Sequence, residues 1–241
     1  MVKTSISVQL APGTLEQAIS AWEEVPLAEL AATVFELAQL RHLRGGAYGP
    51  AIIAINGRSG AGKSTLAMAL AEVAKTRGSE AVILEADDLM WWEPMWQWAH
   101  IAIDGVFESL RRGQGVKLTP PQWKARGREG VIIVPDSTDL LIFEGVGSSQ
   151  IPFSEYLDAA VWVQSDHEVA RRLGLERDIR DATNGNAEES AEFWDRWDES
   201  ERDFLEKDMP WLRADYLVLG TAEPMPGAGL VRVADPATRT V

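Results

Sequence analysis

A glycine-rich run between an apolar segment and a helix-like segment constrains this chain more than any other feature of its sequence. The run consists of Gly57, Arg58, Ser59, Gly60, Ala61, Gly62, Lys63, Ser64 and Thr65. The apolar residues 51–55 precede it and the helix-like residues 66–70 follow it, so we expect a buried strand that turns into a helix. The spacing G-x-x-x-x-G-K-S in this context is the pattern of a phosphate-binding loop, the P-loop.

Several anion-binding groups converge at this run. Glycines allow the backbone to curl until several N–H groups point at one phosphate, and the start of the helix adds a partial positive charge. Lys63 is expected to reach the β- and γ-phosphates, and the Ser64 hydroxyl is expected to bind Mg²⁺. The alternative is a glycine-rich turn without a ligand, but every fixed position of the motif is present. The run therefore predicts binding of ATP and Mg²⁺, with the choice between ATP and GTP left open.

The composition excludes several classes of site and partner. Of the 241 residues, 46% are hydrophobic and 25% are charged, as in an ordinary α/β domain. The net charge of −14, with no long basic run, argues against a nucleic-acid partner. The absence of cysteine excludes disulfides, thiolate zinc sites and a cysteine nucleophile. No apolar stretch reaches the roughly 20 residues that cross a bilayer, and residues 1–10 lack the apolar core of a signal peptide, so we expect a cytoplasmic protein without a membrane partner.

The N-terminal residues predict a helical extension. Thr14 and Gln17 have the spacing of a capping box, and the apolar residues around them repeat at helical spacing. A second apolar stripe covers residues 27–44 and ends in basic residues before a pair of glycines. We expect residues 1–46 to pack as a helical extension on residues 47–241, and a homodimer contact is the alternative role for the stripe.

Five apolar segments alternate with helix-like segments. They are residues 51–55, 81–84, 139–144, 159–163 and 214–219. This alternation predicts an α/β fold with a five-stranded parallel sheet. Residues 230–233 are a further candidate strand, and the strand-like residues 116–119 and 131–134 predict a β-hairpin with a polar, basic insert at its tip.

Acidic residues follow two of these segments, at the edge where open α/β sheets bind ligands. Asp87 and Asp88 come just after residues 81–84, and Glu144 ends another strand. Glu144 is expected to hold Mg²⁺ with Ser64, directly or through water. Asp87 is expected to orient and deprotonate an acceptor hydroxyl if its strand lies beside that of the P-loop. Asp88 is the alternative for this role, unless it caps the next segment.

Aromatic residues are concentrated near these acids. Four of the ten tryptophans lie within residues 91–98, which is typical of a wall that stacks on a flat ligand. The alternative is that the rings cover the core. Trp91 and Trp92, with Trp123 and Arg126 of the hairpin insert, are the candidate acceptor-binding residues beside Asp87 and Asp88.

Arginines gather in the helix that precedes the flexible residues 182–186. They are Arg171, Arg172, Arg177 and Arg180. Grouped arginines before a loop can close over transferring phosphates as a lid, and we expect Arg177 or Arg180 to act in this way. The alternative is a solvent-exposed helix face made of ion pairs.

A second helix is predicted over residues 187–209, with an aromatic stripe that we assign to the core rather than to the site. The stripe consists of Phe193, Trp194, Trp197, Phe204 and Leu205. His42, His100 and His167 show no metal-ligand spacing, so histidine catalysis and a histidine metal site are not expected.

In order and kind, these features resemble the uridine kinase family of the P-loop kinases, which is related to phosphoribulokinase and bacterial pantothenate kinase. The resemblance runs from Ala51 to Gly220. Its more specific motifs are Val82–Asp87, Val131–Pro135 with Leu141–Val146, the arginines 171–180, and Ala214-Asp215. It implies a three-layer P-loop kinase fold with a small hairpin insert for the substrate and an arginine-bearing lid, so that residues 47–241 form a nucleoside-kinase-like domain.

The resemblance implies a kinase that transfers the γ-phosphoryl group of ATP to a hydroxyl of a small, uridine- or cytidine-like molecule. Where the family has a Tyr-Asp pair in the base-reading hairpin, this chain has Pro121-Gln122, so pantothenate, a sugar or an antibiotic remains an alternative acceptor. A non-catalytic ATP-binding regulatory module is a third alternative. The carboxylates of Asp87 and Glu144 at strand ends favour an enzyme, because simple binding requires no acceptor-side base.

Overall fold

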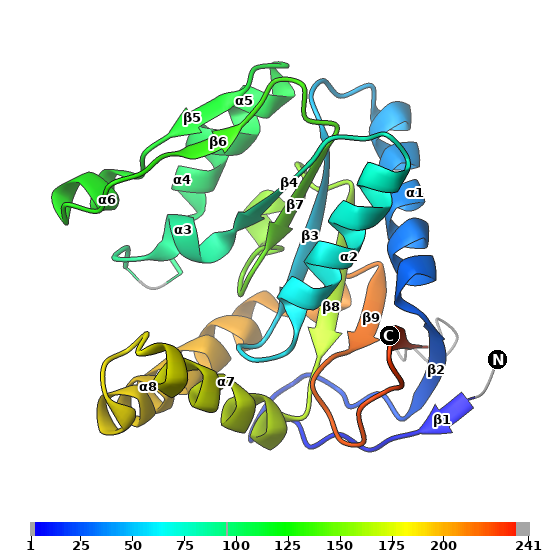
Figure 1. The fold of residues 1–241 in the computed structure, drawn as a ribbon, viewed down its shortest axis with the longest axis vertical. Coiled ribbons are helices and arrows are strands. Elements are labelled where there is room, and N and C mark those ends of the chain that lie inside the picture. Colours follow the sequence, from blue (N-terminus) through cyan, green and yellow to red (C-terminus); the bar gives the residue numbers. More distant parts are fainter. Residues whose placement is uncertain (1–2, 95, 235–241) are drawn as a thin grey trace.

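The computed structural model describes residues 3–94 and 96–234, and within them the main sheet has eight strands in the order β1-β2-β10-β9-β8-β3-β7-β4 (Figure 1). The strands are β1 (Lys3–Ser5), β2 (Ala21–Pro26), β3 (Ala51–Gly57), β4 (Ala81–Glu85), β7 (Leu140–Glu144), β8 (Ala159–Gln164), β9 (Tyr216–Leu219) and β10 (Leu230–Ala234). The described strands β4, β7, β3, β8 and β9 are parallel, which confirms the predicted five-stranded parallel sheet. Strands β10, β2 and β1 extend it in antiparallel fashion, which was not expected for β1 and β2.

Helices and one small hairpin complete the fold. The helices are α1 (Leu27–Gly45), α2 (Lys63–Thr76), α3 (Ala86–Met90), α4 (Ala99–Ala102), α5 (Glu108–Arg111), α6 (Pro121–Ala125), α7 (His167–Asp181) and α8 (Ala187–Asp208), and a π-helical turn at Ile103–Phe107 joins α4 to α5. Strands β5 (Val116–Leu118) and β6 (Ile132–Val134) form the predicted hairpin, and α6 occupies its tip. Among the described helices, none is long and apolar enough to cross a membrane.

Apolar side chains cover both faces of the parallel strands, which gives the molecule three layers. Ile53 and Ile55 of β3 pack with buried residues of α1 and α2 on one face. Ile52 packs on the other face with Phe107 and Phe143, on the side of α4, α5 and the hairpin (Figure 1). Because side chains alternate along a strand, only a strand covered on both faces carries a continuous apolar run such as that of β3.

The predicted first helix of the N-terminal extension is wrong. Residues 21–26 form strand β2 instead, and residues 3–20, the described part before it, have no helical structure. The backbone N–H of Leu15 donates to the carboxylate of Glu206 at 2.6 Å, and that of Ile19 donates to the side-chain oxygen of Gln164 at 2.9 Å. Partners from distant elements thus satisfy backbone groups that a helix would satisfy internally.

Helix α1 agrees with the second predicted helix of the extension. Its buried residues Leu30, Ala31, Val34 and Ala38 recur at helical spacing and join the core shared with α2 and β3. Gly46 ends the helix with φ of +63°, a conformation that favours glycine. The division of the chain at residue 46 stays a prediction, and residues 235–241 of the second predicted domain lie outside the described residues.

Candidate active site

The glycine-rich run forms the strand-to-helix turn between β3 and α2. Gly60 and Gly62 have φ of +74° and +94°, and α2 begins at Lys63. Just after β9, the Thr221 hydroxyl donates to the carbonyl oxygen of Gly60 at 2.6 Å, and the Thr221 N–H donates to that of Ala61 at 3.0 Å. These hydrogen bonds fix the path of the loop from the side of β9.

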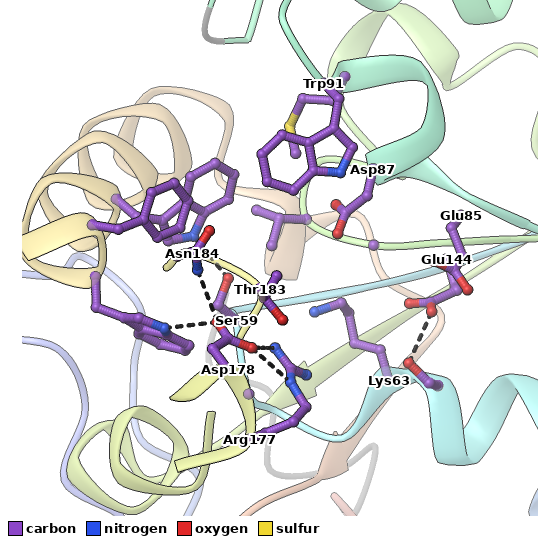
Figure 2. Close-up of a pocket in the computed structure, with 18 residues that line it drawn as sticks. Ser59, Lys63, Glu85, Asp87, Trp91, Glu144, Arg177, Asp178, Thr183 and Asn184 are labelled. Atoms are coloured by element: carbon purple, nitrogen blue, oxygen red, sulfur yellow. Dashed lines mark hydrogen bonds and ion pairs between the residues drawn. The ribbon is translucent and has the colours of Figure 1, made fainter. Parts of the chain in front are cut away.

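The side chain of Lys63 is buried and folds back over the loop. Its Nζ donates to the carbonyl oxygen of Arg58 at 3.1 Å. The ammonium group borders a cavity of about 300 Å³ that Ser59, Gly60 and Ser64 also line (Figure 2). The loop therefore presents a cation and the start of a helix to one enclosed space, which suits the phosphates of a nucleotide.

A pair of oxygen ligands lies at the base of this cavity. Strand β7 adjoins β3, with Glu144 in register with Ile55 of β3, and the Ser64 hydroxyl donates to Glu144 Oε1 at 2.9 Å. Hydroxyl and carboxylate oxygens are the ligands that Mg²⁺ prefers, and Mg²⁺ takes its remaining ligands from water and phosphates. No group of three or more acidic, histidine or cysteine residues among the described residues could hold a metal alone. Ser64 and Glu144 thus fit an ion that also binds ATP.

Asp87 faces the same cavity from the start of α3. Strand β7 lies between β3 and β4, so the expectation that the strand before Asp87 adjoins the P-loop strand is wrong. The carboxylate is accessible through the cavity but protein surrounds it. Burial raises the pKa of Asp87, and Glu144 raises it further, whereas Lys63 opposes the shift. A raised pKa at a cavity wall is the environment of a group that accepts a proton.

Glu85 is a second carboxylate with a raised pKa. It ends β4 in register with Glu144 of β7, and the two side chains lie close together in Figure 2. Burial is the main cause of the raised pKa of Glu85, followed by repulsion from Glu144, Asp88 and Asp87. At the acidic end of the cavity, Glu85 thus lines the wall where the sequence predicts Asp88.

Part of the stripe of α8 lines the cavity, so its assignment to the core rather than to the site is correct for Phe204 and Leu205 but wrong for the other three residues. Phe193, Trp194 and Trp197 all border the cavity. The rings of Phe193 and Trp197 are stacked with centroids 5.9 Å apart, and Trp197 Nε1 donates to the Ser59 hydroxyl at 2.8 Å. Helical spacing identifies the face of α8 that turns inward but not the element opposite, which here is the P-loop.

Only one of the grouped arginines lines the cavity. Arg177 borders it and binds the buried carboxylate of Asp178 at 2.8 Å. Arg180 is exposed and pairs with Asp181 outside the cavity lining. The other two arginines pair with surface carboxylates, Arg171 with Asp195 and Arg172 with Glu223. The solvent-exposed ion-pair alternative therefore describes most of this helix, and Arg177 is the remaining lid candidate.

Several residues predicted to bind the acceptor lie outside the cavity lining. Trp123 is buried against the hairpin, and its Nε1 donates to the backbone oxygen of Asp88 at 2.9 Å. The Asp88 carboxylate pairs with Arg128 at 2.8 Å. Trp92 is 42% exposed, with the guanidinium of Arg126 5.9 Å from its ring centre. The structure brings Trp91, but none of these four predicted residues, together with Asp87 (Figure 2).

The side chain of Arg58 points away from the cavity although it belongs to the glycine-rich run. It is buried among the carboxylates of Glu16, Glu201 and Glu206, at 3.9, 3.6 and 3.7 Å. Glu201 also accepts a hydrogen bond from the Ser59 N–H at 2.8 Å. Arg58 therefore ties the N-terminal segment and α8 to the loop. Other predicted nucleotide-binding residues outside the lining are Gly57, Ala61, Gly62 and Thr65.

Polar lining residues beyond the predicted ones come from β4 and from the end of α7. They are Glu85, Asp178, Thr183 and Asn184. Glu85 could have been found as an acid at a strand end, like Glu144. Asp178, Thr183 and Asn184 carry no motif, because only the return of α8 against α7 turns them inward.

The contact between α7 and α8 predicts the effect of a conservative substitution. Trp194 Nε1 donates to the buried Asp178 carboxylate at 2.9 Å, and Gly174 of α7 leaves room for the indole. Trp194→Phe keeps an aromatic side chain but removes the indole N–H, so Asp178 loses one hydrogen-bond donor. We expect thermal unfolding to show a loss of about 1–2 kcal/mol in the free energy of unfolding. The control Trp92→Phe changes an exposed ring, and an equal loss in both variants would contradict the assigned role.

Solved structures share the fold of this chain, although no protein-family model and no curated protein matches the sequence. A candidate fructose transport system kinase of Silicibacter sp. TM1040 aligns with a TM-score of 0.53 and 16% identity over 76% of this chain and 94% of its own. The D-glycerate 3-kinase of Cryptococcus neoformans aligns with a TM-score of 0.52 and 14% identity over 72% of this chain and 88% of its own. A candidate uridine kinase of Bacillus stearothermophilus aligns with a TM-score of 0.46 and 17% identity over 78% of this chain and 98% of its own. The chain therefore has the fold of the P-loop kinases, as its resemblance to the uridine kinase family predicts.

Proposed function

We propose that this protein is a kinase that transfers the γ-phosphoryl group of ATP to a hydroxyl of a small molecule. One observation carries the proposal: a single cavity is lined by Lys63 of the P-loop, by the Ser64–Glu144 pair and by Asp87. A module that only bound ATP would need no carboxylate with a raised pKa facing the phosphate end of its site.

Each of the residues that line the cavity has its own role in the proposed phosphoryl transfer. Lys63 and the loop N–H groups bind the β- and γ-phosphates, and Arg177 neutralises charge on the transferred group. Ser64 and Glu144 would hold Mg²⁺, which would supply positive charge to offset that of the phosphates. Asp87 orients the acceptor hydroxyl and takes its proton. The hydroxyl oxygen forms a bond to the γ-phosphorus while the bond from that phosphorus to the bridging oxygen of ADP breaks.

The aromatic rings around the cavity serve to exclude water. Trp91 comes from one side, and Phe193 and Trp197 of α8 come from the other. A kinase must favour its acceptor over water as the attacking group, because water also accepts a phosphoryl group. These rings take up part of the space that a competing water would need.

An acceptor screen tests the proposal. ADP release would be measured with ATP, Mg²⁺ and a panel containing uridine, cytidine, pantothenate, sugars and aminoglycosides. We expect one chemical class to stimulate ADP release well above the rate without acceptor. The resemblance favours a nucleoside, but the hairpin residue Trp123 does not line the cavity, so a non-nucleoside is an equal candidate. No stimulation by any acceptor would instead favour the regulatory ATP-binding module.

The metal pair gives a separate prediction. Glu144→Gln removes a carboxylate that accepts from Ser64 at 2.9 Å and would bind Mg²⁺. We expect the Mg²⁺ concentration for half-maximal turnover to rise about 10-fold or more. Glu72→Gln, on the exposed face of α2, is the matched control and should leave the Mg²⁺ titration unchanged. Identical titrations of the two variants would argue against a metal role for Glu144.

A further inference from the structure

The charges that line the cavity are unbalanced in a way that bears on the acceptor. Among the described residues, the lining carries four carboxylates, Glu85, Asp87, Glu144 and Asp178, and two cations, Lys63 and Arg177. Both cations are needed by the nucleotide phosphates in the proposed reaction. Of the charged groups in the lining, only carboxylates are therefore left to border the acceptor.

Two of these carboxylates already have partners. Glu144 accepts from the Ser64 hydroxyl at 2.9 Å. Asp178 accepts from Trp194 Nε1 at 2.9 Å and pairs with Arg177 at 2.8 Å. Their charge is thus committed to the metal pair and to the α7–α8 contact.

Glu85 and Asp87 remain. Both line the cavity, and among the described residues neither carboxylate has a hydrogen bond or ion pair with another side chain. The basic side chain that acts on Glu85 is Arg128, but Arg128 pairs with Asp88 at 2.8 Å and stacks 3.5 Å from the ring centre of Trp123. Two carboxylates of the cavity wall are therefore left facing the acceptor space without a committed cation.

Aromatic faces border the same space. Trp91 lies beside Asp87 in Figure 2, and the stacked rings of Phe193 and Trp197 of α8 also line the cavity. Ammonium groups are attracted both to carboxylates and to the faces of aromatic rings. A carboxylate or phosphate on the acceptor would be repelled by Glu85 and Asp87. The net charge of −14 also raises the local concentration of cations near the protein.

We propose that the acceptor carries an ammonium group beside its reactive hydroxyl. Glu85 binds this ammonium group, and the rings of Trp91 and Phe193 pack against the acceptor. This inference rests on the proposed kinase function and narrows it to amino-alcohol or amino-sugar chemistry. Asp87 remains the group that takes the hydroxyl proton, and Glu85 is the residue that selects for charge.

The test uses two sets of compounds of similar size, whose members carry an ammonium group, no charge or a carboxylate. One set is glucosamine, glucose and glucuronate, and the other is serinol, glycerol and glycerate. Affinity for the full-length protein with Mg²⁺ and a non-hydrolysable ATP analogue is read from tryptophan fluorescence, and turnover is read from ADP release. We expect the ammonium member of each set to bind at least about 10-fold more tightly than the neutral member, and the carboxylate member to bind most weakly. Equal affinities, or tightest binding of a carboxylate, would overturn the inference.

Glu85→Gln separates selection for charge from a metal role. In this variant the affinity ratio of ammonium to neutral member should fall close to one. The control Glu129→Gln removes an exposed carboxylate of the hairpin that does not line the cavity, and it should keep the wild-type ratio. If Glu85→Gln raised the Mg²⁺ requirement and kept the ratio, Glu85 would serve the metal and the inference would fail.

The two readouts also separate this inference from the kinase proposal. Ammonium-selective binding without any ADP release would support the acceptor chemistry and contradict the kinase function. ADP release that is fastest with a neutral or carboxylate member would support the kinase function and contradict the ammonium inference.

Discussion

Replacing Asp87 by asparagine is expected to lower kcat with the best acceptor by about 10²–10⁴-fold, the usual contribution of a positioned general base. Asparagine keeps the shape of the side chain but cannot take the hydroxyl proton. The affinity for ATP should change little, because Asp87 lies across the cavity from the P-loop amides. ADP release at saturating ATP and acceptor measures the loss, and nucleotide titration measures the retained affinity.

The same substitution is expected to raise Tm at pH 7. Burial raises the pKa of Asp87, so the folded state disfavours its ionised form and loses stability as pH rises from the unfolded pKa through the folded one. Removing the charge recovers that stability at neutral pH, and the gain disappears below the unfolded pKa. Asp88→Asn is the control, since Asp88 pairs with Arg128 outside the cavity lining and should give neither effect. Full turnover in Asp87→Asn would reject its assigned role.

Asp87 also sets the expected pH dependence of the wild type. The carboxylate accepts a proton only when it is ionised, and its raised pKa delays ionisation to higher pH. Turnover should therefore rise with pH through a pKa above the ordinary range of aspartate. The acid limb of kcat/KM, measured with MgATP held saturating, tests this. An acid limb in the range of an exposed aspartate would contradict the described environment.

The second large effect is expected for Lys63→Ala. Its ammonium borders the cavity and now donates to the carbonyl oxygen of Arg58, from which it can turn to the phosphates. Loss of this cation should lower kcat/KM for ATP by about 10³-fold, the scale of removing one group that stabilises developing charge. Calorimetric titration with ATP should show weaker binding as well. Lys75→Ala, at the exposed end of the same helix, is the matched control.

Unchanged ATP binding and turnover in Lys63→Ala would show that the glycine-rich run is only a structural turn. A loss of ATP binding alone would not separate the kinase from a regulatory module, because both would use Lys63. The Asp87 result distinguishes them, since only the kinase needs a base beside the acceptor.

The features that local sequence determines are the ones that the structure bears out. Fixed spacing defines the turn from β3 to α2, because each glycine and Lys63 has a role within a few residues. The continuous apolar run of β3 identifies a strand covered on both faces. An acid at the end of β7 is brought near Ser64 because parallel strands in an open sheet end at one edge.

The features that distant partners determine are the ones that the sequence does not predict. Leu15 and Ile19 have helical spacing, but their N–H groups donate to the side chains of Glu206 and Gln164. The segment therefore does not form a helix. An aromatic residue near the site, such as Trp123, is typical of a wall that binds a ligand, but here the ring is buried against the hairpin. In both cases contacts outside the local segment decide the outcome.

The aromatic face of α8 illustrates the same limit at the site. Its period predicts that Trp194 and Trp197 turn inward, which they do. What they meet depends on the path of the chain through α7: Trp197 contacts the P-loop and Trp194 contacts α7, rather than a core strand. The cavity is thus built by one local motif and one long-range contact.

Transfer of label from the γ-phosphorus of ATP tests the central claim most directly. ATP labelled at that atom would be incubated with the full chain, Mg²⁺ and the acceptor that most stimulates ADP release, and the products would be separated. The account predicts label in a phosphate ester of the acceptor, formed in equal amount with ADP and lost in Asp87→Asn. Label found only in inorganic phosphate, with the acceptor unmodified, would contradict it.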